Sequence, residues 1–123
     1  MALVPSYFCA QKLKEKIMRR KYFTNTRVAG VQYGEALFCR EVLKPGKELQ
    51  MKREAENLYD HNAIALYCGD YRIGYIPSAD NKQLVTFLDQ GWSDIFEVYI
   101  DRYDEDVHPE RQIGITIFVK EKE

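Results

Sequence analysis

The sequence predicts a mainly β protein, a small antiparallel barrel formed by one domain. Its 123 residues suit one domain with a real core, and we expect no second one. Short segments rich in β-branched and aromatic residues follow one another, separated by glycine and proline turns. Helical patterns between them are too few to supply the crossovers that parallel strands need. We therefore expect six strands curled around one core, and two helices.

The first 22 residues predict a helix that precedes the barrel. Apolar side chains at spacings of three and four indicate an amphipathic helix over residues 6–21, which Ser6 can cap. Residues 12–21 hold six Lys or Arg and one acid, although the whole chain has a net charge of −1. The helix either lies across the barrel or forms a mobile arm, and its charges suit phosphates or an anionic surface. The barrel domain is expected over residues 23–123.

Four of the six strands are expected in the first two thirds of the chain. Residues 23–33 alternate with a period of two, and Gly30 inside them indicates a bend or a bulge. A turn at Pro45–Gly46 leads into a strand of alternating apolar and charged residues. Residues 62–77 indicate a hairpin, because Gly69–Asp70 fits a two-residue turn between two strands.

One helix is inserted between the strands. Pro77 ends the hairpin, Ser78 is placed to cap the helix, and Gly91 is placed to stop it. The buried stripe of this helix is expected to consist of Leu84, Phe87 and Leu88. Two further strands complete the barrel, at residues 94–103 and 111–120.

Composition restricts the environment of the protein and its metal chemistry. No apolar run approaches the roughly 18 residues that span a bilayer, and the N-terminus lacks the features of a signal peptide. We therefore expect an intracellular protein without a membrane partner, cytoplasmic if bacterial. Three widely spaced cysteines indicate reduced, buried thiols rather than a disulfide framework or a zinc site: Cys9, Cys39 and Cys68.

Enzyme motifs are absent from the sequence. It has no nucleophile elbow, zinc-protease helix, phosphate-binding loop or dinucleotide fingerprint. Asp104, Asp106 and His108 share an acidic loop, but the glycine and the distal glutamate of a calcium loop are missing. A hydrolase that uses Asp60 and His61 as an acid–base pair remains an alternative, since folding can bring other groups to them. We expect a protein that is not an enzyme, with no cofactor and no metal.

Three motifs in a fixed order resemble those of a known family. They are "RVAGVQY", "LQMKREAENLYDHNAIAL" and "YRIGYIP", and the second contains N-x-Y-D-x-N-A-I, the most specific part. In this order and spacing they resemble the HIRAN domain over about residues 23–92. The matching residues are Arg53, Glu54, Asn57, Tyr59, Asp60, Asn62, Ala63, Ile64, Gly74, Ile76 and Pro77.

The resemblance implies an OB-like barrel that captures the 3′ end of single-stranded DNA. Carried over by position, Asp60 would accept a hydrogen bond from the free 3′-hydroxyl, and Tyr59 and Tyr33 would stack on bases. Asn57 would shape the loop or contact the end. An internal phosphodiester would bring a second negative charge against Asp60, so selectivity for an end would follow. The remaining contacts are expected from Gln32, Arg53, Tyr75 and Lys82.

The chain also departs from the DNA-binding members of the family. Where they have Arg-Tyr-Tyr, it has Gln32, Tyr33 and Gly34, and so lacks one cation and one aromatic ring. Pro77 and Ser78 stand where a lysine would help, with Lys82 near in sequence. These departures concern affinity rather than fold.

The same motif has an interpretation without a ligand. Asn57 and Asp60 would close an Asx-type turn, Asn62 would satisfy backbone groups, and Arg53 would pair with a neighbouring glutamate. Two functions are therefore expected. The first is a DNA-end-binding module that recruits repair or replication proteins, and the second is a protein-interaction adaptor that has lost the DNA site. The sequence predicts no oligomeric state.

Overall fold

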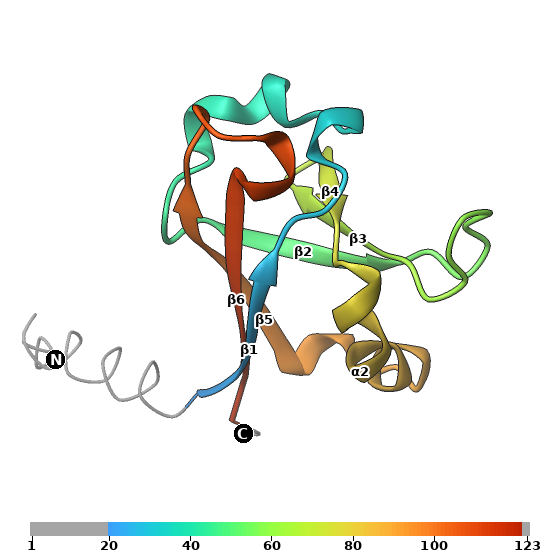
Figure 1. Cartoon of the computed structure of the whole chain (residues 1–123). Coiled ribbons are helices and arrows are strands. Elements are labelled where there is room, and N and C mark those ends of the chain that lie inside the picture. The colour runs from blue at the N-terminus through green and yellow to red at the C-terminus, as the bar shows by residue number, and fades with distance from the viewer. Residues whose placement is uncertain (1–19, 122–123) are drawn as a thin grey trace, which may run out of the picture.

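Six strands dominate the computed structural model, which describes residues 20–121 (Figure 1). They are β1 (Lys21–Arg27), β2 (Glu48–Arg53), β3 (Ile64–Cys68), β4 (Tyr71–Tyr75), β5 (Phe96–Tyr103) and β6 (Ile113–Val119). The helix α2 (Ser78–Asp89) lies between β4 and β5 in the chain. Four short 3₁₀-helices join these elements: η1 (Val31–Tyr33), η2 (Ala36–Val42), η3 (Ser93–Ile95) and η4 (Pro109–Arg111). The predicted mainly β class with six strands is confirmed.

The N-terminal helix that the sequence predicts falls mainly on residues 1–19, which lie outside the described residues. β1 begins at Lys21 rather than at residue 23, so Lys21 and Tyr22 belong to the sheet. The division of the chain at residues 22 and 23 stays a prediction. No helix of the described part is long and apolar enough to span a membrane.

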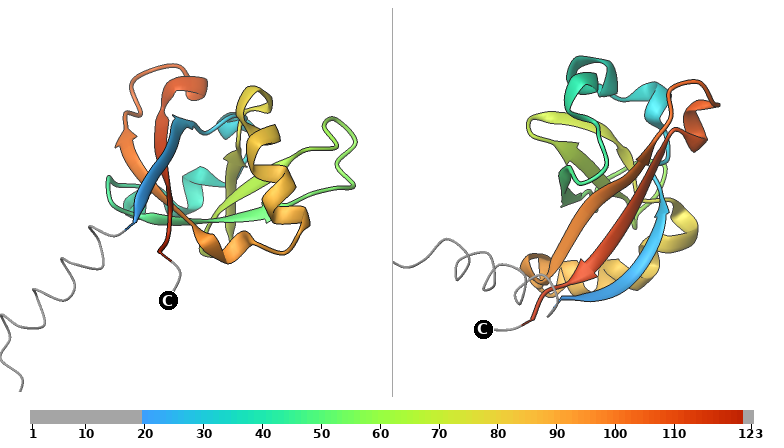
Figure 2. Two further views of the ribbon diagram at one scale, coloured as in Figure 1. Left: turned by 90° about the horizontal axis from the view of Figure 1, so that it is seen from below. Right: turned by 90° about the vertical axis from the view of Figure 1, so that its left-hand side faces the viewer.

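The strands form one antiparallel sheet in the order β1-β6-β5-β2-β3-β4. Figure 2 shows β1, β6 and β5 side by side on one side of the molecule, with β2, β3 and β4 crossing on the other. The edge strands β1 and β4 are not paired within residues 20–121, and an isolated bridge joins Ala29, two residues beyond β1, to Tyr75 at the end of β4. Each N–H donates to the other's carbonyl, at 2.8 and 2.9 Å. The sheet is not closed, and the predicted barrel is therefore not confirmed.

The core lies inside the curve of this sheet. Alternate residues of each strand point into it, as the period of two requires. The fully buried large side chains include Ile64, Leu66, Ile73, Ile100, Ile113, Ile115 and Ile117. Each such burial stabilises the fold by about 1.5 to 3 kcal/mol relative to an exposed side chain. The core therefore holds β2, β3 and β4 rigidly beneath the loops that they carry.

The first predicted strand is shorter than expected. It ends at Arg27 instead of continuing to residue 33. Gly30 has φ +70°, a left-handed conformation that turns the chain out of the strand and into η1. Gly74 permits the close approach beside this turn, because a Cβ there would lie 2.4 Å from Val28 Cγ1 and 2.5 Å from the Ala29 carbonyl oxygen. The two glycines bring η1 against the edge of β4.

The two predicted turns are present. Gly69–Asp70 joins β3 to β4 as a two-residue hairpin turn, with φ +62° at Gly69. At Pro45–Gly46 the Lys47 N–H donates to the Lys44 carbonyl at 3.0 Å, and Gly46 has φ +94°. Both turns follow from glycine supplying a backbone conformation that other residues avoid.

The sequence predicts the C-terminal end of α2 correctly, but not its N-terminal cap. Ser78 is the first helical residue and not the cap, because Pro77 takes the cap position and its carbonyl accepts the N–H groups of Asp80 and Asn81, at 2.9 and 3.0 Å. The cap prediction for Ser78 is therefore wrong. Gly91 stops the helix as predicted, with φ +86° just beyond its end.

The buried face of α2 also differs from the predicted stripe. Leu84 is fully buried and Leu88 packs against the core, as expected. Phe87 is 40% exposed and packs against Phe96 in a T-shaped arrangement, with ring centroids 5.7 Å apart. Its place in the core is taken by Val85 and by a polar residue, Asn81. A buried asparagine escapes a search for apolar periodicity.

Candidate nucleic-acid interface

The loop between β2 and β3 holds the N-x-Y-D motif and projects from the body of the molecule (Figure 1). Asn57 Oδ1 accepts hydrogen bonds from the backbone N–H of Tyr59 at 2.8 Å and of Asp60 at 3.1 Å. Asp60 Oδ1 accepts in turn from the Asn62 N–H at 2.9 Å. These are Asx-type turns, in which a side-chain oxygen replaces a backbone acceptor. Asn57 and Asp60 thus shape the loop as the turn interpretation predicts.

The Tyr59 ring takes no part in these turns. It is 98% exposed at the tip of the loop, and its neighbour Leu58 is 94% exposed. Folding gains almost nothing from an aromatic ring that stays in water. Tyr59 therefore presents an exposed ring on the residue that precedes Asp60 in the loop.

Asp60 is fixed from a second side by α2. Asn81 Nδ2 donates to Asp60 Oδ2 at 2.8 Å. The hydrogen bond from the Asn62 N–H and then that from Asn81 hold the pKa of Asp60 below its ordinary value of 3.8, so the carboxylate is ionised at neutral pH. Each carboxylate oxygen has two lone pairs and accepts one of these donors, so both oxygens keep capacity for another donor.

Tyr75, at the end of β4, joins this loop through Glu54. Its hydroxyl donates to Glu54 Oε1 at 3.0 Å, and Asn57 Nδ2 donates to the same oxygen at 3.1 Å. Arg72 Nη1 donates to the Tyr75 hydroxyl at 3.2 Å. Burial and then Glu54 raise the pKa of Tyr75, so the phenol keeps its proton. The sequence did not single out Arg72, although it supplies a cation here.

Gln32, Tyr33 and Lys82 lie at the margins of this group. Gln32 and Tyr33 are exposed on η1, Tyr33 to 78%, beside the edge of β4. Lys82 is exposed on α2, next in sequence to Asn81. The structure thus connects Asn57, Asp60 and Tyr75 through hydrogen bonds, while Gln32 and Tyr33 lie on η1 and Lys82 lies on α2.

The Arg53 side chain is held by hydrogen bonds within the protein. Its Nε and Nη2 donate to the carboxylate of Asp89, at 2.8 and 3.5 Å, and its Nη1 donates to the Ala63 carbonyl at 3.1 Å. The partner is therefore the last residue of α2 and not a neighbouring glutamate. This pairing fastens the base of the loop to the helix that carries Asn81.

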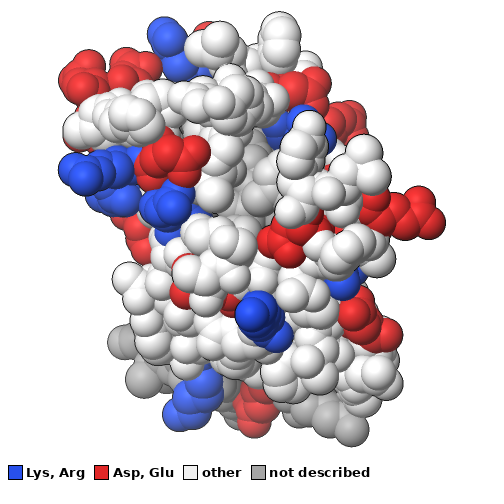
Figure 3. All heavy atoms as spheres, turned by 45° about the vertical axis from the view of Figure 1, so that its right-hand side comes forward, with Lys and Arg blue, Asp and Glu red and all other residues white. Residues whose placement is uncertain are grey.

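Charge on this side of the molecule is mixed. Figure 3 shows Lys and Arg interspersed with Asp and Glu, without a continuous basic surface. Phosphate contacts supply most of the sequence-independent affinity of nucleic-acid binders. Any binding at this face would therefore depend on stacking and on specific hydrogen bonds more than on charge.

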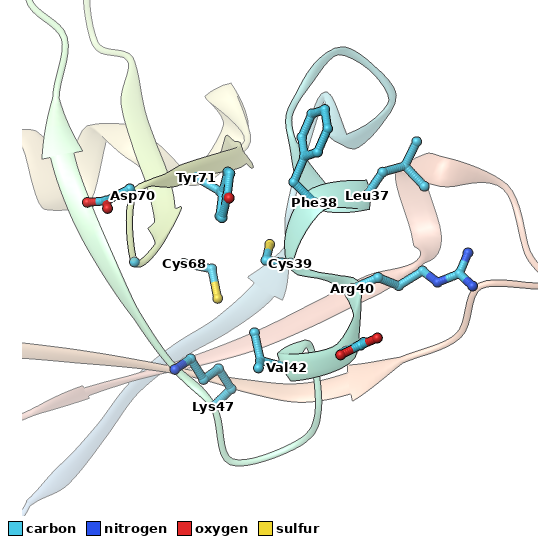
Figure 4. A pocket seen from close by; sticks show the side chains of 11 residues that line it. Leu37, Phe38, Cys39, Arg40, Val42, Lys47, Cys68, Asp70 and Tyr71 are labelled. Atoms are coloured by element: carbon cyan, nitrogen blue, oxygen red, sulfur yellow. The ribbon is translucent and has the colours of Figure 1, made fainter.

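A separate pocket of about 540 Å³ lies between η2 and the β3–β4 hairpin (Figure 4). Phe38 stacks on Tyr71 at its rim, with ring centroids 5.9 Å apart. Cys39 and Cys68 approach it from opposite sides, both buried and free. Burial and then Cys68 raise the pKa of Cys39 to about 11. The expected reduced, buried thiols are confirmed for these two cysteines, while Cys9 lies outside residues 20–121.

No sequence pattern indicated this pocket. Residues 36–42 show neither strand nor helix periodicity, and only their exposed Leu37 and Phe38 could have drawn attention. No group of three or more His, Cys, Asp or Glu in the described part of the chain could hold a metal ion.

Comparison with known proteins decides the family. The model of the HIRAN domain matches residues 21–122, nearly all of the chain. The chain belongs to the HIRAN domain family. A protein from Lactobacillus plantarum has a similar structure, with a TM-score of 0.69 and 21% identity over 84% of this chain and 97% of that one. The human HLTF HIRAN domain has a TM-score of 0.54 and 18% identity, over 85% of this chain and 83% of that one.

These similarities show that the chain has the same fold as the two solved structures. Identities of 21% and 18% are too low to carry residue roles across. A comparison with curated proteins found no match. The roles of the motif residues must therefore be argued from their own geometry.

Proposed function

We propose that this HIRAN domain binds single-stranded DNA by a free 3′ end, at the loop between β2 and β3. One observation carries the proposal, namely that the 98% exposed Tyr59 is followed directly in the loop by Asp60, whose carboxylate is held in place by Asn62 and Asn81. Membership of the HIRAN family supports a DNA-binding role, since the family occurs in DNA-binding fork-remodelling proteins. The exposed ring and the ionised carboxylate are the two groups that a strand end requires.

The chemistry of Asp60 favours an end over the interior of a strand. A 3′-hydroxyl can donate to a carboxylate oxygen that still has a free lone pair. An internal nucleotide carries a phosphodiester at the same place, with a negative charge and no proton to donate. Asp60 therefore acts as an acceptor for the end and as a barrier against internal nucleotides.

The remaining predicted residues have supporting roles in this proposal. Tyr59 stacks on the terminal base, and Tyr75 and Tyr33 offer further rings at the edge of β4. Stacking contributes about 1 to 3 kcal/mol per base. Lys82 provides charge for the phosphates, and Gln32 a neutral hydrogen-bonding contact. Arg53 and Asn57 hold the loop in shape.

In this role the domain is not an enzyme. It marks DNA ends and recruits repair or replication proteins to them, because an end-specific site without catalytic groups can only bind. Within residues 20–121 the hydrogen-bond partners of the Asp60 oxygens are the Asn62 N–H and the Asn81 amide, and neither is an acid or a base. This arrangement argues against an acid–base role for Asp60 with His61.

The test is fluorescence anisotropy with one labelled single strand that ends in a 3′-hydroxyl, a 3′-deoxy carbon or a 3′-phosphate. We expect the hydroxyl end to bind most tightly, the deoxy end about tenfold more weakly because a charged hydrogen bond is lost, and the phosphate end more weakly still. A fully paired blunt duplex serves as the control. Equal binding of the three ends would contradict end recognition.

A second candidate, a protein-interaction adaptor, is favoured by the surface around the pocket at η2. Leu37 and Phe38 are 78% and 72% exposed there, beside about 540 Å³ of open space. Exposed apolar patches of this kind are typical of protein contacts. A domain that serves as an adaptor alone would show no preference among the three DNA ends.

A further inference from the structure

The outer face of β2, β3 and β4 carries tyrosines and cations in two neighbouring rows. Paired residues of antiparallel strands lie on the same face, and the register defines which residues form each row. One row is Lys52, Ala65 and Tyr75, and the next is Gln50, Tyr67 and Arg72. Both rows lie on the face opposite Ile64, Leu66 and Cys68, although Ala65 is itself buried beneath its neighbours and Tyr67 is half-buried.

Each tyrosine of this outer face lies beside a cation. Lys52 Nζ is 4.8 Å from the centre of the Tyr67 ring, and Arg72 Cζ is 5.4 Å from the centre of the Tyr75 ring. Lys52 and Arg72 form no ion pair with an acid within residues 20–121. Arg72 Nε is shielded from water and has no hydrogen-bond partner in that range. Lys52 is exposed and thus available to an anionic ligand, whereas Arg72 is half-buried and would have to meet one with its terminal nitrogens rather than with Nε.

The outer face is continuous with the proposed end site. Tyr75 belongs to the first row and is joined through Glu54 to Asn57 in the loop. Tyr67 lies one row farther from the loop, two residues along β3 from Ala65, a step of roughly 7 Å. Aromatic rings spaced along a cationic surface are the usual platform for single strands.

We propose that this outer face binds the nucleotides that precede the 3′-terminal one in the same single strand. Tyr67 stacks on a base, and Lys52 and Arg72 contact the adjoining phosphates. This inference rests on the proposed function, because the strand must first be held by its end. It assigns the DNA a direction: its 3′ end lies at the loop, and the preceding nucleotides cross β4 and β3 toward β2.

The test compares thymidine oligonucleotides of two and six residues, each with a free 3′-hydroxyl, by anisotropy. We expect the wild type to bind the longer strand at least tenfold more tightly. Tyr67→Leu keeps an apolar side chain on the strand, and it should lose about tenfold on the longer strand while leaving the shorter one unchanged. Tyr22→Leu is the matched control, because Tyr22 is 61% exposed on β1.

Lys52→Gln provides a second variant at an exposed position that should not affect folding. It should weaken binding of the longer DNA strand severalfold. The slope of log affinity against log salt concentration should become shallower by about one. If both variants bind the longer strand like the wild type, the outer-face site is refuted, even when the wild type still prefers a 3′-hydroxyl. If Tyr67 matters but the ends bind alike, Tyr67 contacts the strand without end recognition, and the proposed function is refuted together with the direction assigned here.

Discussion

Asp60→Asn is expected to abolish the preference of the domain for a free 3′-hydroxyl. The substitution keeps the shape of the side chain but removes its charge, and with it both the strong acceptor and the repulsion of a terminal phosphate. A hydrogen bond to a charged group contributes about 1.5 to 3 kcal/mol, so the affinity for the hydroxyl end should fall at least about tenfold. The anisotropy assay should then give nearly equal affinities for the strands that end in a 3′-hydroxyl, a 3′-deoxy carbon and a 3′-phosphate.

The loop should keep its structure in Asp60→Asn. Asn81 Oδ1 is buried without a hydrogen-bond partner among residues 20–121, and a half-turn of the Asn81 amide would let it accept from the new Asn side chain. Asp70→Asn is the control, since Asp70 is an exposed aspartate at the far end of the β3–β4 hairpin. If Asp60→Asn kept the full preference for the hydroxyl end, Asp60 would not be its acceptor.

Gly74→Ala should have the largest effect on stability among the substitutions considered. The new Cβ would lie 2.4 Å from Val28 Cγ1 and 2.5 Å from the Ala29 carbonyl oxygen, which is backbone and cannot turn aside. Overpacking of this kind costs about 1 to 3 kcal/mol. The chain would have to part at the bridge between Ala29 and Tyr75, where the segment that follows β1 meets the end of β4. Urea denaturation should show a lower free energy of unfolding.

Gly114→Ala is the matched control for this prediction. Gly114 also lies in a strand without a positive φ, and its added Cβ would meet the side chains of Asp101 and Arg102. Those side-chain ends can move, so the cost should be smaller by about 1 kcal/mol or more. Similar losses of stability in the two variants would show that the contact with β1 is not what requires glycine at position 74.

The parts of the fold that could be predicted are those set by local backbone chemistry. The Gly69–Asp70 turn, the Pro45–Gly46 turn and the stop at Gly91 all depend on residues whose conformational preferences are strong. The end of β1 was misplaced because Val31 and Tyr33 suit a strand, while the left-handed Gly30 turns them into a 3₁₀-helix. Whether the sheet closes into a barrel depends on how all six strands are arranged, and the pattern of one segment does not reveal it.

Only the N-x-Y-D motif of the candidate site could be predicted from the sequence. The turn made by Asn57 and Asp60 is local, and spacing reveals it. The contact from Asn81 joins residues far apart in sequence, and polar residues inside a helix give no signal of burial. The partner of Arg53 was missed for the same reason. The pairing of Tyr67 with Lys52 needs the strand register, which a sequence alone does not supply.

The central claim, that the loop between β2 and β3 holds the 3′ end, is tested most directly by an NMR titration of backbone amides. The ligand is a six-residue thymidine strand with a free 3′-hydroxyl. The largest shifts should occur at Tyr59, Asp60 and Asn62, whose N–H groups bond to the motif side chains, with smaller shifts over residues 72–75. Largest shifts over residues 36–42, at the separate pocket, would place the strand elsewhere and contradict the account.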